Sequence, residues 1–466
     1  MRPKNIRFHR TGARRRAAGI GATLAMAMGI AQEVRAMDLM QSYEIALQQD
    51  PTYQAARADA DASREAVPQA FAQLLPNLSA NLSQGANKTD SIAPGYFGTP
   101  VASVFSYQSS SYAVVLRQPI YRKYNFALYQ QAKSQADSAD ATLDQNLQDL
   151  VVRLSGAYFE ALMAQDQLAL VLSTKQTYAA QLEGAKRSFK AGEGTRTDID
   201  DAQARYDMIV AQELEATQNV GYTRRQLQAV TNQPAENLAL LDPARMTLIP
   251  PLPAKVDDWI ARGEDVNAEL RSARANIDSA RQEVEKARAG HTPTVDLVVQ
   301  RGRDNSANEL TINQYFLSTM IGVQATIPMF SGGYVRSQVR QAQASLEKYQ
   351  QLYEAKRRDI DLQIRKEFQN VAEGVLKVRA LEQAERSADQ AVFSNQKGFQ
   401  AGTRTQIDIL NAEQQRMNAK RDLAQARYAY IMARIRLQGL VGSLNETEIG
   451  TVNSWLTRSR APAAGG

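Results

Sequence analysis

The chain has 466 residues, no cysteine and a formal net charge of +6. Residues 1–36 hold eight lysines and arginines against one acid, so the rest of the chain has 47 basic and 48 acidic residues and a net charge of −1. A nearly neutral chain of this kind is not typical of a nucleic-acid-binding protein, and without cysteine its stability depends on packing or assembly rather than on disulfides.

Residues 1–36 are typical of a secretory signal peptide. Arg14–Arg16 close a basic segment, Ala17–Ala31 form an apolar core, and Val34–Ala36 are a small-x-small cleavage site. The apolar core is shorter than the ~20 residues of a membrane span. The alternative, an N-terminal amphipathic helix, is disfavoured because the core is apolar on all faces. We therefore expect an exported protein that begins at Met37.

The region 37–240 is expected to form a first structural repeat, which starts with a short helix and a second helix and continues with a strand pair at 77–119. In this pair, Leu78, Ala80 and Leu82 alternate with Asn and Ser. Alternation of apolar and small polar residues fits strands with lipid on one side and water on the other. Aromatic residues cluster at both strand ends, as in the interfacial girdles of membrane barrels. A half-buried soluble sheet is the alternative.

A long helix at 121–190 and a shorter helix at 197–231 are expected to complete the first repeat. The long segment contains apolar residues that step by four and three positions, as in Leu143, Leu147 and Leu150. This spacing is typical of the narrow seam of a coiled coil. A helix of ~70 residues is about 100 Å long.

The region 241–445 repeats the same order of elements, so we expect a tandem duplication. Its elements are a helix, a strand pair at 294–328, a long helix at 333–398 and a helix at 405–440. The proline-rich segment Asn232–Lys255 joins the two repeats. Residues 446–466 are expected to form a flexible C-terminal tail.

Two strand pairs supply four strands, which cannot close a membrane barrel. The smallest such barrels have about eight strands, and an open sheet edge is not tolerated in lipid. If the strands enter a membrane, several copies of the chain must therefore combine. Two, three or four copies would give about 8, 12 or 16 strands, and this arithmetic does not choose among them.

A twelve-residue phrase occurs in both repeats, as FKAGEGTRTDID at Phe189–Asp200 and as FQAGTRTQIDIL at Phe399–Leu410. Each is expected to be a tight turn between helices, in which Gly192 or Gly402 ends the first helix in the left-handed conformation. Capping boxes with Asp in place of Glu or Gln are expected to start the second helix, from Thr197 with Asp200 and from Thr405 with Asp408. The first copy would then carry a two-residue insertion, Glu193-Gly194.

Both copies also contain an arginine that capping does not need, Arg196 and Arg404. A cation beside a helix N-terminus opposes the helix dipole by roughly 0.3–1 kcal/mol. We therefore expect an acidic partner for each arginine. The neighbouring candidates are Asp198, Asp200, Asp201 and Asp408.

Signatures of an enzyme are missing from the sequence after residue 36. This part holds a single histidine, His291, no cysteine nucleophile, and no HExxH or P-loop motif. Its carboxylates are interspersed with Lys and Arg on helical segments, which is typical of a solvated surface. We expect neither catalysis nor a metal or other cofactor.

From Met37 onward, nearly the whole chain resembles the TolC family of outer-membrane efflux and secretion ducts. The most specific segments are Met37–Pro51, Leu74–Leu78, Pro328–Gln343, Ala401–Glu413 and Ala426–Glu446. The resemblance implies a mainly helical homotrimer, whose four strands per chain complete a twelve-stranded barrel in the outer membrane of a Gram-negative bacterium. The helices would form a coiled-coil tunnel in the periplasm. Implied partners are a periplasmic adaptor (membrane-fusion) protein and an inner-membrane transporter of the ABC, RND or MFS type, in addition to outer-membrane lipid.

The resemblance also implies roles at the two helix turns, which form the periplasmic tip in this family. Arg404 matches the arginine that latches the closed tunnel, and Thr197 and Asp198 match its partners. Phe399 stands where relatives often have a tyrosine, so a hydroxyl bond is lost here. Arg196 stands where an apolar residue is expected, which implies an additional ion pair at this tip.

A constriction ring is implied one turn into the last long hairpin helix. Asp408 matches one carboxylate of this ring, whereas Asn411 stands where a second acid is common. Asp200 or Asp201 would then have to compensate for the missing acid.

The sequence therefore predicts a passive exit duct of a tripartite efflux pump or of a type I protein secretion system, gated at its periplasmic tip. The alternative is a periplasmic coiled-coil scaffold or adaptor without a barrel. Whether the cargo is a drug, a metal or a secreted protein is left open.

Overall fold

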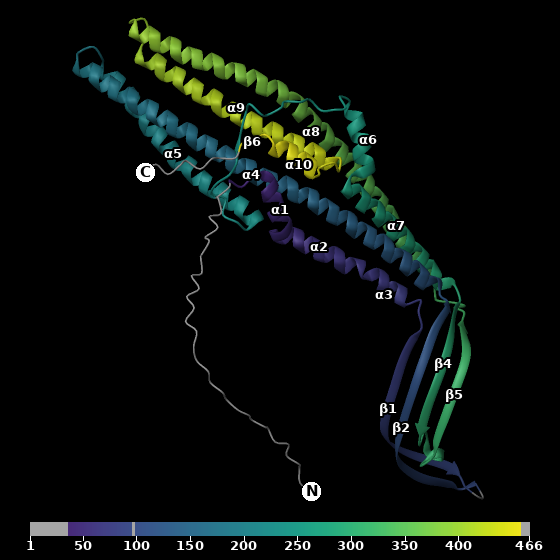
Figure 1. Ribbon diagram of the computed structural model, residues 1–466. Helices are drawn as coiled ribbons and strands as arrows, with labels where there is room; N and C mark the ends of the chain where they lie inside the picture. The colour runs from purple at the N-terminus through teal and green to yellow at the C-terminus, as the bar shows by residue number, and fades with distance from the viewer. Residues whose placement is uncertain (1–35, 96–97, 458–466) are drawn as a thin grey trace, which may run out of the picture.

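The computed structural model describes residues 36–95 and 98–457. The chain is elongated: a body of long helices continues at one end into a sheet of long strands, which projects at an angle from the helices (Figure 1). No helix in the described ranges combines the length and the apolar character that crossing a membrane requires. The signal peptide expected at 1–36 lies outside the described residues, apart from Ala36.

The first half of the chain begins with short helices and ends with a long helical hairpin. Its elements are α1 (Leu39–Gln49), α2 (Pro51–Arg64), α3 (Ala66–Ala72), β1 (Asn77–Pro94), β2 (Pro100–Tyr121), α4 (Lys123–Lys190) and α5 (Arg196–Thr231). α1 starts at the N-cap Asp38, which forms a capping box with Gln41. α4 has 68 residues, so it is about 100 Å long.

The second half repeats this order after a proline-rich joint. The joint itself contains β3 (Leu240–Leu241). The elements after it are α6 (Val256–Val266), α7 (Ala268–Arg288), the 3₁₀ turn η2 (Ala289–His291), β4 (Thr294–Asn305), the 3₁₀ turn η3 (Glu309–Thr311), β5 (Tyr315–Thr326), α8 (Tyr334–Gln400), α9 (Gln406–Leu440), α10 (Glu446–Asn453) and β6 (Leu456–Thr457). Figure 1 shows the hairpins α4–α5 and α8–α9 side by side, with both turns at the end away from the sheet.

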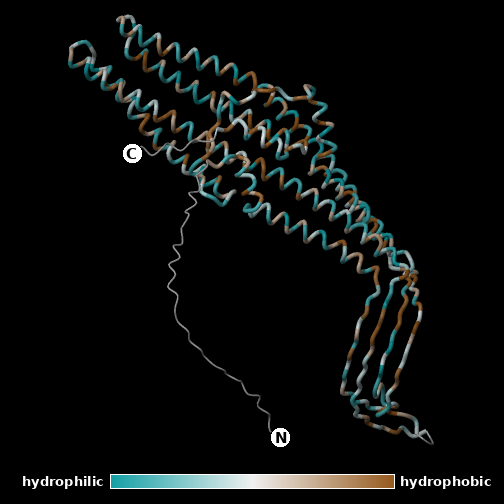
Figure 2. Tube along the Cα trace, viewed as in Figure 1, coloured by the Kyte–Doolittle hydropathy of each residue, from teal (hydrophilic) through white to brown (hydrophobic). Residues whose placement is uncertain are grey.

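The large sheet is antiparallel throughout, in the order β1-β2-β4-β5. One face carries Leu82, Val114, Ile321 and Val323, all of which are exposed in the single chain. Figure 2 shows hydrophobic residues along these strands. The opposite face carries Asn and Ser on β1. A continuous exposed apolar face is a contact surface for lipid or for another chain.

An ion pair fixes the junction between the sheet and the helices. Arg122, the N-cap residue of α4, donates from Nε to Asp296 Oδ1 at 2.8 Å and also from Nη2 to Oδ2. Arg117 lies 3.8 Å from the same carboxylate. Because Asp296 belongs to β4 and is 5% exposed, this contact ties the second strand pair to the start of the first long helix.

The main hydrophobic core lies where the two halves meet in the middle of the helical body. Tyr158 of α4 places its hydroxyl 3.0 Å from the carbonyl oxygens of Met37 and Ala239. The hydroxyl of Tyr430 on α9 donates to the Ile249 carbonyl at 2.9 Å. Buried tyrosines thus satisfy the backbone of the N-terminal segment and of the joint.

The segment expected to be a flexible tail contains α10 and β6 instead. Ile449, Val452 and Trp455 are each 3% exposed, and β6 pairs with β3 in the joint. The expectation was wrong for residues 446–457 because these apolar side chains complete the main core. Residues 458–466 lie outside the described residues.

Candidate functional site

The candidate site is formed by the two helix turns at the end of the body away from the sheet. They span residues 191–195 between α4 and α5 and residues 401–405 between α8 and α9. Gly192 and Gly402 have φ angles of 80° and 75°, the left-handed conformation that glycine adopts without strain after a helix. Both glycines therefore end a long helix as the sequence predicts.

The register of the first turn differs from the expected one. The N-cap residues are Thr195 and Thr405, so the two turns have equal length. The expected capping box of Thr197 with Asp200 was wrong, and Glu193-Gly194 is not an insertion. Thr195 takes the cap because it stands as far from Gly192 as Thr405 does from Gly402.

The two N-caps have the same geometry. The N–H of Thr195 donates to Asp198 Oδ2 at 2.9 Å, and the N–H of Thr405 donates to Asp408 Oδ2 at 2.9 Å. Each threonine hydroxyl lies within hydrogen-bond distance of the same Oδ2. Hydrogen bonds from the Thr405 backbone and hydroxyl hold the pKa of Asp408 below its ordinary value, and the nearby Arg404 charge adds to this effect. Asp198 and Asp408 are thus equivalent carboxylates at the two turns.

The two arginines are not equivalent. Arg196 follows its N-cap and donates from Nε to Asp200 Oδ1 at 3.1 Å on its own helix, with both side chains exposed. Arg404 precedes its N-cap, and none of the ion pairs within the described ranges includes it. The expected acidic partner is therefore present for Arg196, whereas Arg404 is near enough to Asp408 to lower the pKa of its carboxyl but forms no ion pair with it in the described ranges.

A glycine makes room for Arg404. A Cβ on Gly398 would lie 2.5 Å from Cγ of Arg404, and a Cβ on Gly194 would lie 3.2 Å from Cβ of Ser188. Ser188 and Gly398 occupy equivalent positions, as do Gly194 and Arg404. Each turn therefore places one side chain against a glycine at this contact, a serine in the first turn and an arginine in the second. Sequence reasoning missed Gly398, although a glycine in the last turn of a long helix was a visible signal.

Below the turns, polar side chains connect the two hairpins. Arg205 of α5 donates from Nη2 to Asn411 Oδ1 on α9 at 2.7 Å. Tyr178 of α4 donates to Gln414 Oε1 on α9 at 3.3 Å. Burial raises the pKa of Tyr178. These bonds border an apolar cluster to which α4, α5 and α9 contribute, with Val171, Leu182, Ile209, Leu410 and Met417 among its members.

The remaining expected site residues lie at the surface of the turns. Phe399 is 40% exposed and is equivalent to Phe189, which is 44% exposed. Thr197 is exposed at the second position of α5, and Asp201 is half-buried. Asn411, expected beside the constriction ring, accepts the bond from Arg205. Nothing in the sequence pattern marks Arg205, because its partner lies 206 residues away.

Metal ligation has no candidate among residues 36–95 and 98–457. No group of three or more His, Cys, Asp and Glu side chains there could hold an ion. The geometry of the turns is that of capped helix ends with charged rims.

Comparisons with known proteins give consistent results over most of the chain. A family model described as outer membrane efflux protein matches residues 42–233 and 260–443. The alkaline protease secretion protein AprF of Pseudomonas aeruginosa is 33% identical over 434 residues, which cover 93% of this chain and 90% of that protein. The proteases secretion protein PrtF of Dickeya chrysanthemi is 31% identical over 446 residues, which cover 95% of both proteins.

Two further similarities concern outer-membrane proteins of Vibrio cholerae. The outer membrane protein TolC is 30% identical over 430 residues, which cover 92% of this chain and 95% of that protein. The crystal structure of the outer membrane protein VceC superposes with a TM-score of 0.74 at 20% identity, over 87% of this chain and 97% of that one. The latter similarity supports the fold.

Proposed function

Because this chain belongs to the outer membrane efflux protein family, we propose that it is the exit duct of a type I protein secretion system. The resemblance to outer-membrane ducts is confirmed: the chain is an outer-membrane channel of a Gram-negative bacterium with a helical tunnel in the periplasm. The observation that favours protein cargo is its similarity to two protease secretion proteins over 90% and 95% of their lengths.

We infer a channel of three copies. The four strands leave β1 and β5 as edges within the described sheet, so several copies must combine to close a barrel. Strand arithmetic allows two, three or four copies, and the choice of three rests on the family to which the chain belongs. The alternative scaffold without a barrel is disfavoured, because it would expose Leu82 and Ile321 to water at 73% and 72% of their surface.

The duct is passive in this proposal. A periplasmic adaptor and an inner-membrane transporter supply recognition and energy, and this chain supplies a continuous aqueous path. The relatives that the chain resembles are secretion and outer-membrane proteins, which supports a role without catalysis.

The gate in this proposal is the tip of the two hairpins. Arg404 of one subunit reaches Asp198 and Thr197 of the neighbouring subunit and holds the tip closed, with Phe399 packed beside it. Three observations support this latch. Gly398 makes room for Arg404, and Arg404 is absent from the ion pairs of the described ranges. The capping bonds from Thr195 go to Oδ2 of Asp198, so its Oδ1 can accept a bond from the neighbouring subunit. Arg196 and Asp200 add an ion pair on the rim.

The constriction in this proposal is lined by carboxylates. Asp408 of three subunits forms the ring that favours cations. In the observed register Asp198 is equivalent to Asp408 and Asp201 to Asn411. Because Asp198 is the proposed partner of Arg404, Asp201 is the candidate for a second acidic position. Asn411 adds no charge to the ring, because its side chain is a neutral amide, and its Oδ1 accepts a bond from Arg205.

Deletion of the gene in the native bacterium tests the cargo. Proteins in the culture supernatant and sensitivity to a panel of drugs and metal salts are compared with and without the chain. Loss of one or a few secreted proteins, restored by the gene in trans, is the expected result. Drug or metal sensitivity with an unchanged supernatant would overturn protein secretion in favour of efflux.

A further inference from the structure

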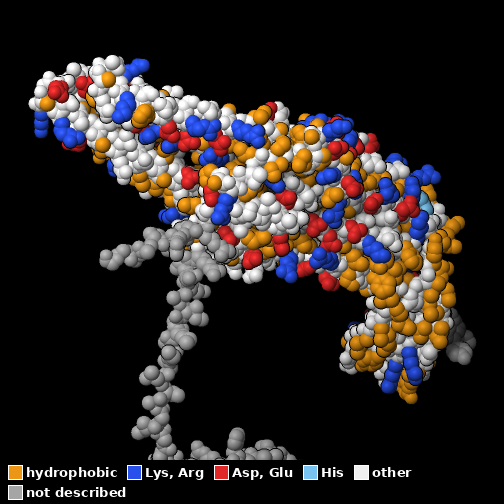
Figure 3. All heavy atoms as spheres, turned by 45° about the horizontal axis from the view of Figure 1, so that its top comes forward, with side chains coloured by type: hydrophobic (Ala, Val, Ile, Leu, Met, Phe, Trp, Pro, Cys, Tyr) orange, Lys and Arg blue, Asp and Glu red, His pale blue; other side chains and the backbone are white. Residues whose placement is uncertain are grey.

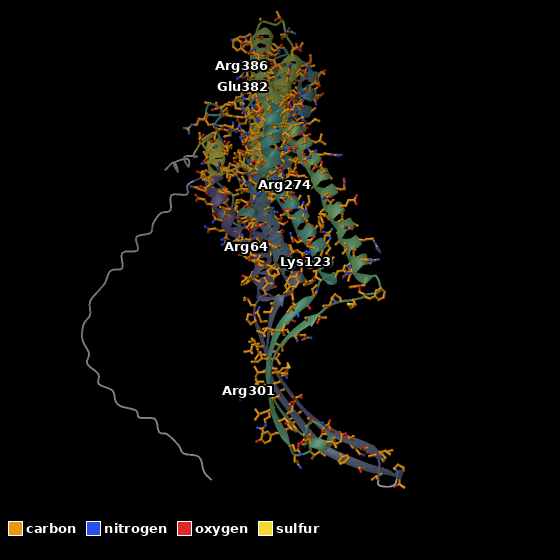
Figure 4. The ribbon with its side chains drawn as sticks, turned by 90° about the vertical axis from the view of Figure 1, so that its right-hand side faces the viewer. Arg64, Lys123, Arg274, Arg301, Glu382 and Arg386 are labelled. Atoms are coloured by element: carbon orange, nitrogen blue, oxygen red, sulfur yellow. The ribbon has the colours of Figure 1, made fainter. Side chains whose placement is uncertain are left out.

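Two arginines lie on the outward, apolar face of the sheet. Along β4, Arg301 and Arg303 continue the face of Val295, Leu297 and Val299, because alternate residues of a strand share a face. Both arginines are exposed. Figure 3 shows basic side chains within the hydrophobic surface of the projecting sheet, and Figure 4 places Arg301 on that sheet, away from the helices.

The cross-strand neighbours of the two arginines offer no counter-charge. Arg301 is paired with Val114 and Thr319. Arg303 is paired with Tyr112 and Leu317.

The acid next to them in sequence faces the other way. Asp304 lies on the opposite face, where it accepts a bond from Ser111 Oγ at 2.5 Å. None of the ion pairs within the described ranges includes Arg301 or Arg303. The other charges on this face, Lys88 and Asp90, belong to β1, which is separated from β4 by β2.

The position along the strand indicates the depth in the membrane. Arg301 and Arg303 lie six and eight residues beyond Val295, or roughly 15–20 Å higher for a strand tilted by ~40°. The apolar band of an outer-membrane barrel is about 25 Å tall. The backbone at the two arginines therefore lies in the outer half of the band, roughly 5–10 Å below the edge that is remote from the periplasmic helices. Their long side chains can extend toward that edge, where the headgroups of the outer leaflet begin.

The guanidinium of Arg303 is held against an aromatic ring. Its Cζ lies 4.5 Å from the ring centre of Tyr315, a cation–π contact. Tyrosines of this kind mark the membrane interface. A guanidinium fixed in this way keeps its planar fork of N–H donors, which matches phosphate oxygens in pairs.

From this arrangement we propose that Arg301 and Arg303 bind the phosphates of a phosphorylated glycolipid in the outer leaflet. The apolar band contacts the acyl chains and the two arginines contact the headgroup. A closed trimer has three such sites. The proposed occupant is a lipid because the face that carries the two arginines also carries the apolar side chains of Val299 and Val114, which would contact acyl chains.

The test uses the purified full-length trimer in detergent. It is incubated with lipid A that carries two phosphates or with the same lipid after enzymatic dephosphorylation, and retained lipid is quantified by mass spectrometry after washing. We expect the phosphorylated lipid to be retained at least roughly tenfold better, the factor that one charge-assisted hydrogen bond predicts. Equal retention of the two lipids would overturn the proposal without any mutation.

A double variant tests whether Arg301 and Arg303 cause the preference for phosphorylated lipid. The double substitution Arg301→Gln and Arg303→Gln should abolish the preference for the phosphorylated lipid, and replacement of both residues by Lys should keep part of it. Arg386→Gln is the matched control, because Arg386 is on α8, far from the sheet, and bonds Gln383 of its own helix (Figure 4). A preference that survives in the double Gln variant would place the lipid elsewhere. Unchanged single-channel conductance shows that the variant still forms the channel, so this result is independent of the cargo proposal.

Discussion

At the scale of single residues, each turn at the tip contains a close contact between the end of its first helix and the residue before the next helix cap. The two turns have different side chains at this contact. In the first turn Ser188 faces Gly194, and in the second Gly398 faces Arg404. The two halves of the duplicated chain thus have the same turn geometry but different charge. Only the second half presents an arginine before the helix cap, so the proposed latch belongs to the α8–α9 hairpin.

Arg404→Ser should increase the open fraction or conductance of single channels in planar bilayers. Each subunit loses a charge-assisted hydrogen bond to its neighbour, which shifts the closed–open equilibrium by roughly tenfold per bond. Gly398→Ala should have a similar effect, because the added Cβ displaces Arg404. In an Arg404→Ser background, Gly398→Ala should add little. Unchanged conductance for Arg404→Ser would show that Arg404 does not hold the tip closed.

The cation preference of the channel should depend on the charge of Asp408. The capping bonds lower the pKa of this carboxyl, so it stays ionised until the pH falls below the ordinary value of about 3.9. Reversal potentials in a KCl gradient should therefore be constant from neutral pH to about pH 5 and lose cation preference only in stronger acid. Asp408→Asn should weaken the preference at all pH values.

Two outcomes would contradict this assignment. If Asp408→Asn leaves the reversal potential unchanged, another ring determines selectivity. If cation selectivity is already lost at a pH above the ordinary pKa of aspartate, repulsion among the three carboxylates outweighs the effect of their capping bonds.

At the scale of elements, the contacts of α4 and α5 with α9 bear on the proposed gate as well as the turns. The bond from Arg205 to Asn411 and the bond from Tyr178 to Gln414 link the two hairpins of one subunit. A tip that opens by moving one hairpin relative to the other must break both bonds. In the proposed gate, these contacts of α4 and α5 with α9 would therefore stabilise the closed state in parallel with Arg404.

Arg205→Ala should raise single-channel conductance, because the hydrogen bond lost to Asn411 is solvent-exposed and still contributes roughly 0.5–1 kcal/mol. Asn411→Ala should do the same, and the double variant should be no more open than either single variant, as expected for two ends of one bond. Lys186→Ala is the matched control, since Lys186 pairs with Glu183 on its own helix. Additive effects of Arg205→Ala and Asn411→Ala would mean that the two residues act separately.

The helices and strands were predictable because each is a repeating pattern within one segment. Which threonine caps α5 was not predictable from the sequence. Thr195 and Thr197 both precede an aspartate by three residues, and only the turn geometry distinguishes them. The bond of Arg205 to Asn411 depends on the packing of helices 206 residues apart in sequence. The tail folds because Trp455 completes a core built by distant segments, which its local sequence does not reveal.

At the scale of the whole molecule, the exposed apolar face of the sheet ties stability to assembly in the membrane. The described single chain leaves β1 and β5 unpaired at the sheet edges and exposes Ile321 at 72% and Val323 at 68%. Such a sheet is stable in lipid only after its edges are paired with those of other copies. Barrel closure, membrane insertion and trimer formation should therefore be one cooperative step.

Ile321→Arg should destabilise the assembled trimer, because arginine at a lipid-facing position near the bilayer midplane costs about 2–4 kcal/mol. Gln324→Arg, on the opposite face of the same strand, is the matched control and should be tolerated in an aqueous lumen. The readout is the temperature at which the trimer band disappears on gels of outer-membrane fractions heated in steps. We expect a lower temperature for Ile321→Arg alone. Equal stability of the two variants, or recovery of the wild-type chain as a heat-labile protein in the soluble periplasmic fraction, would refute the barrel and favour a periplasmic scaffold.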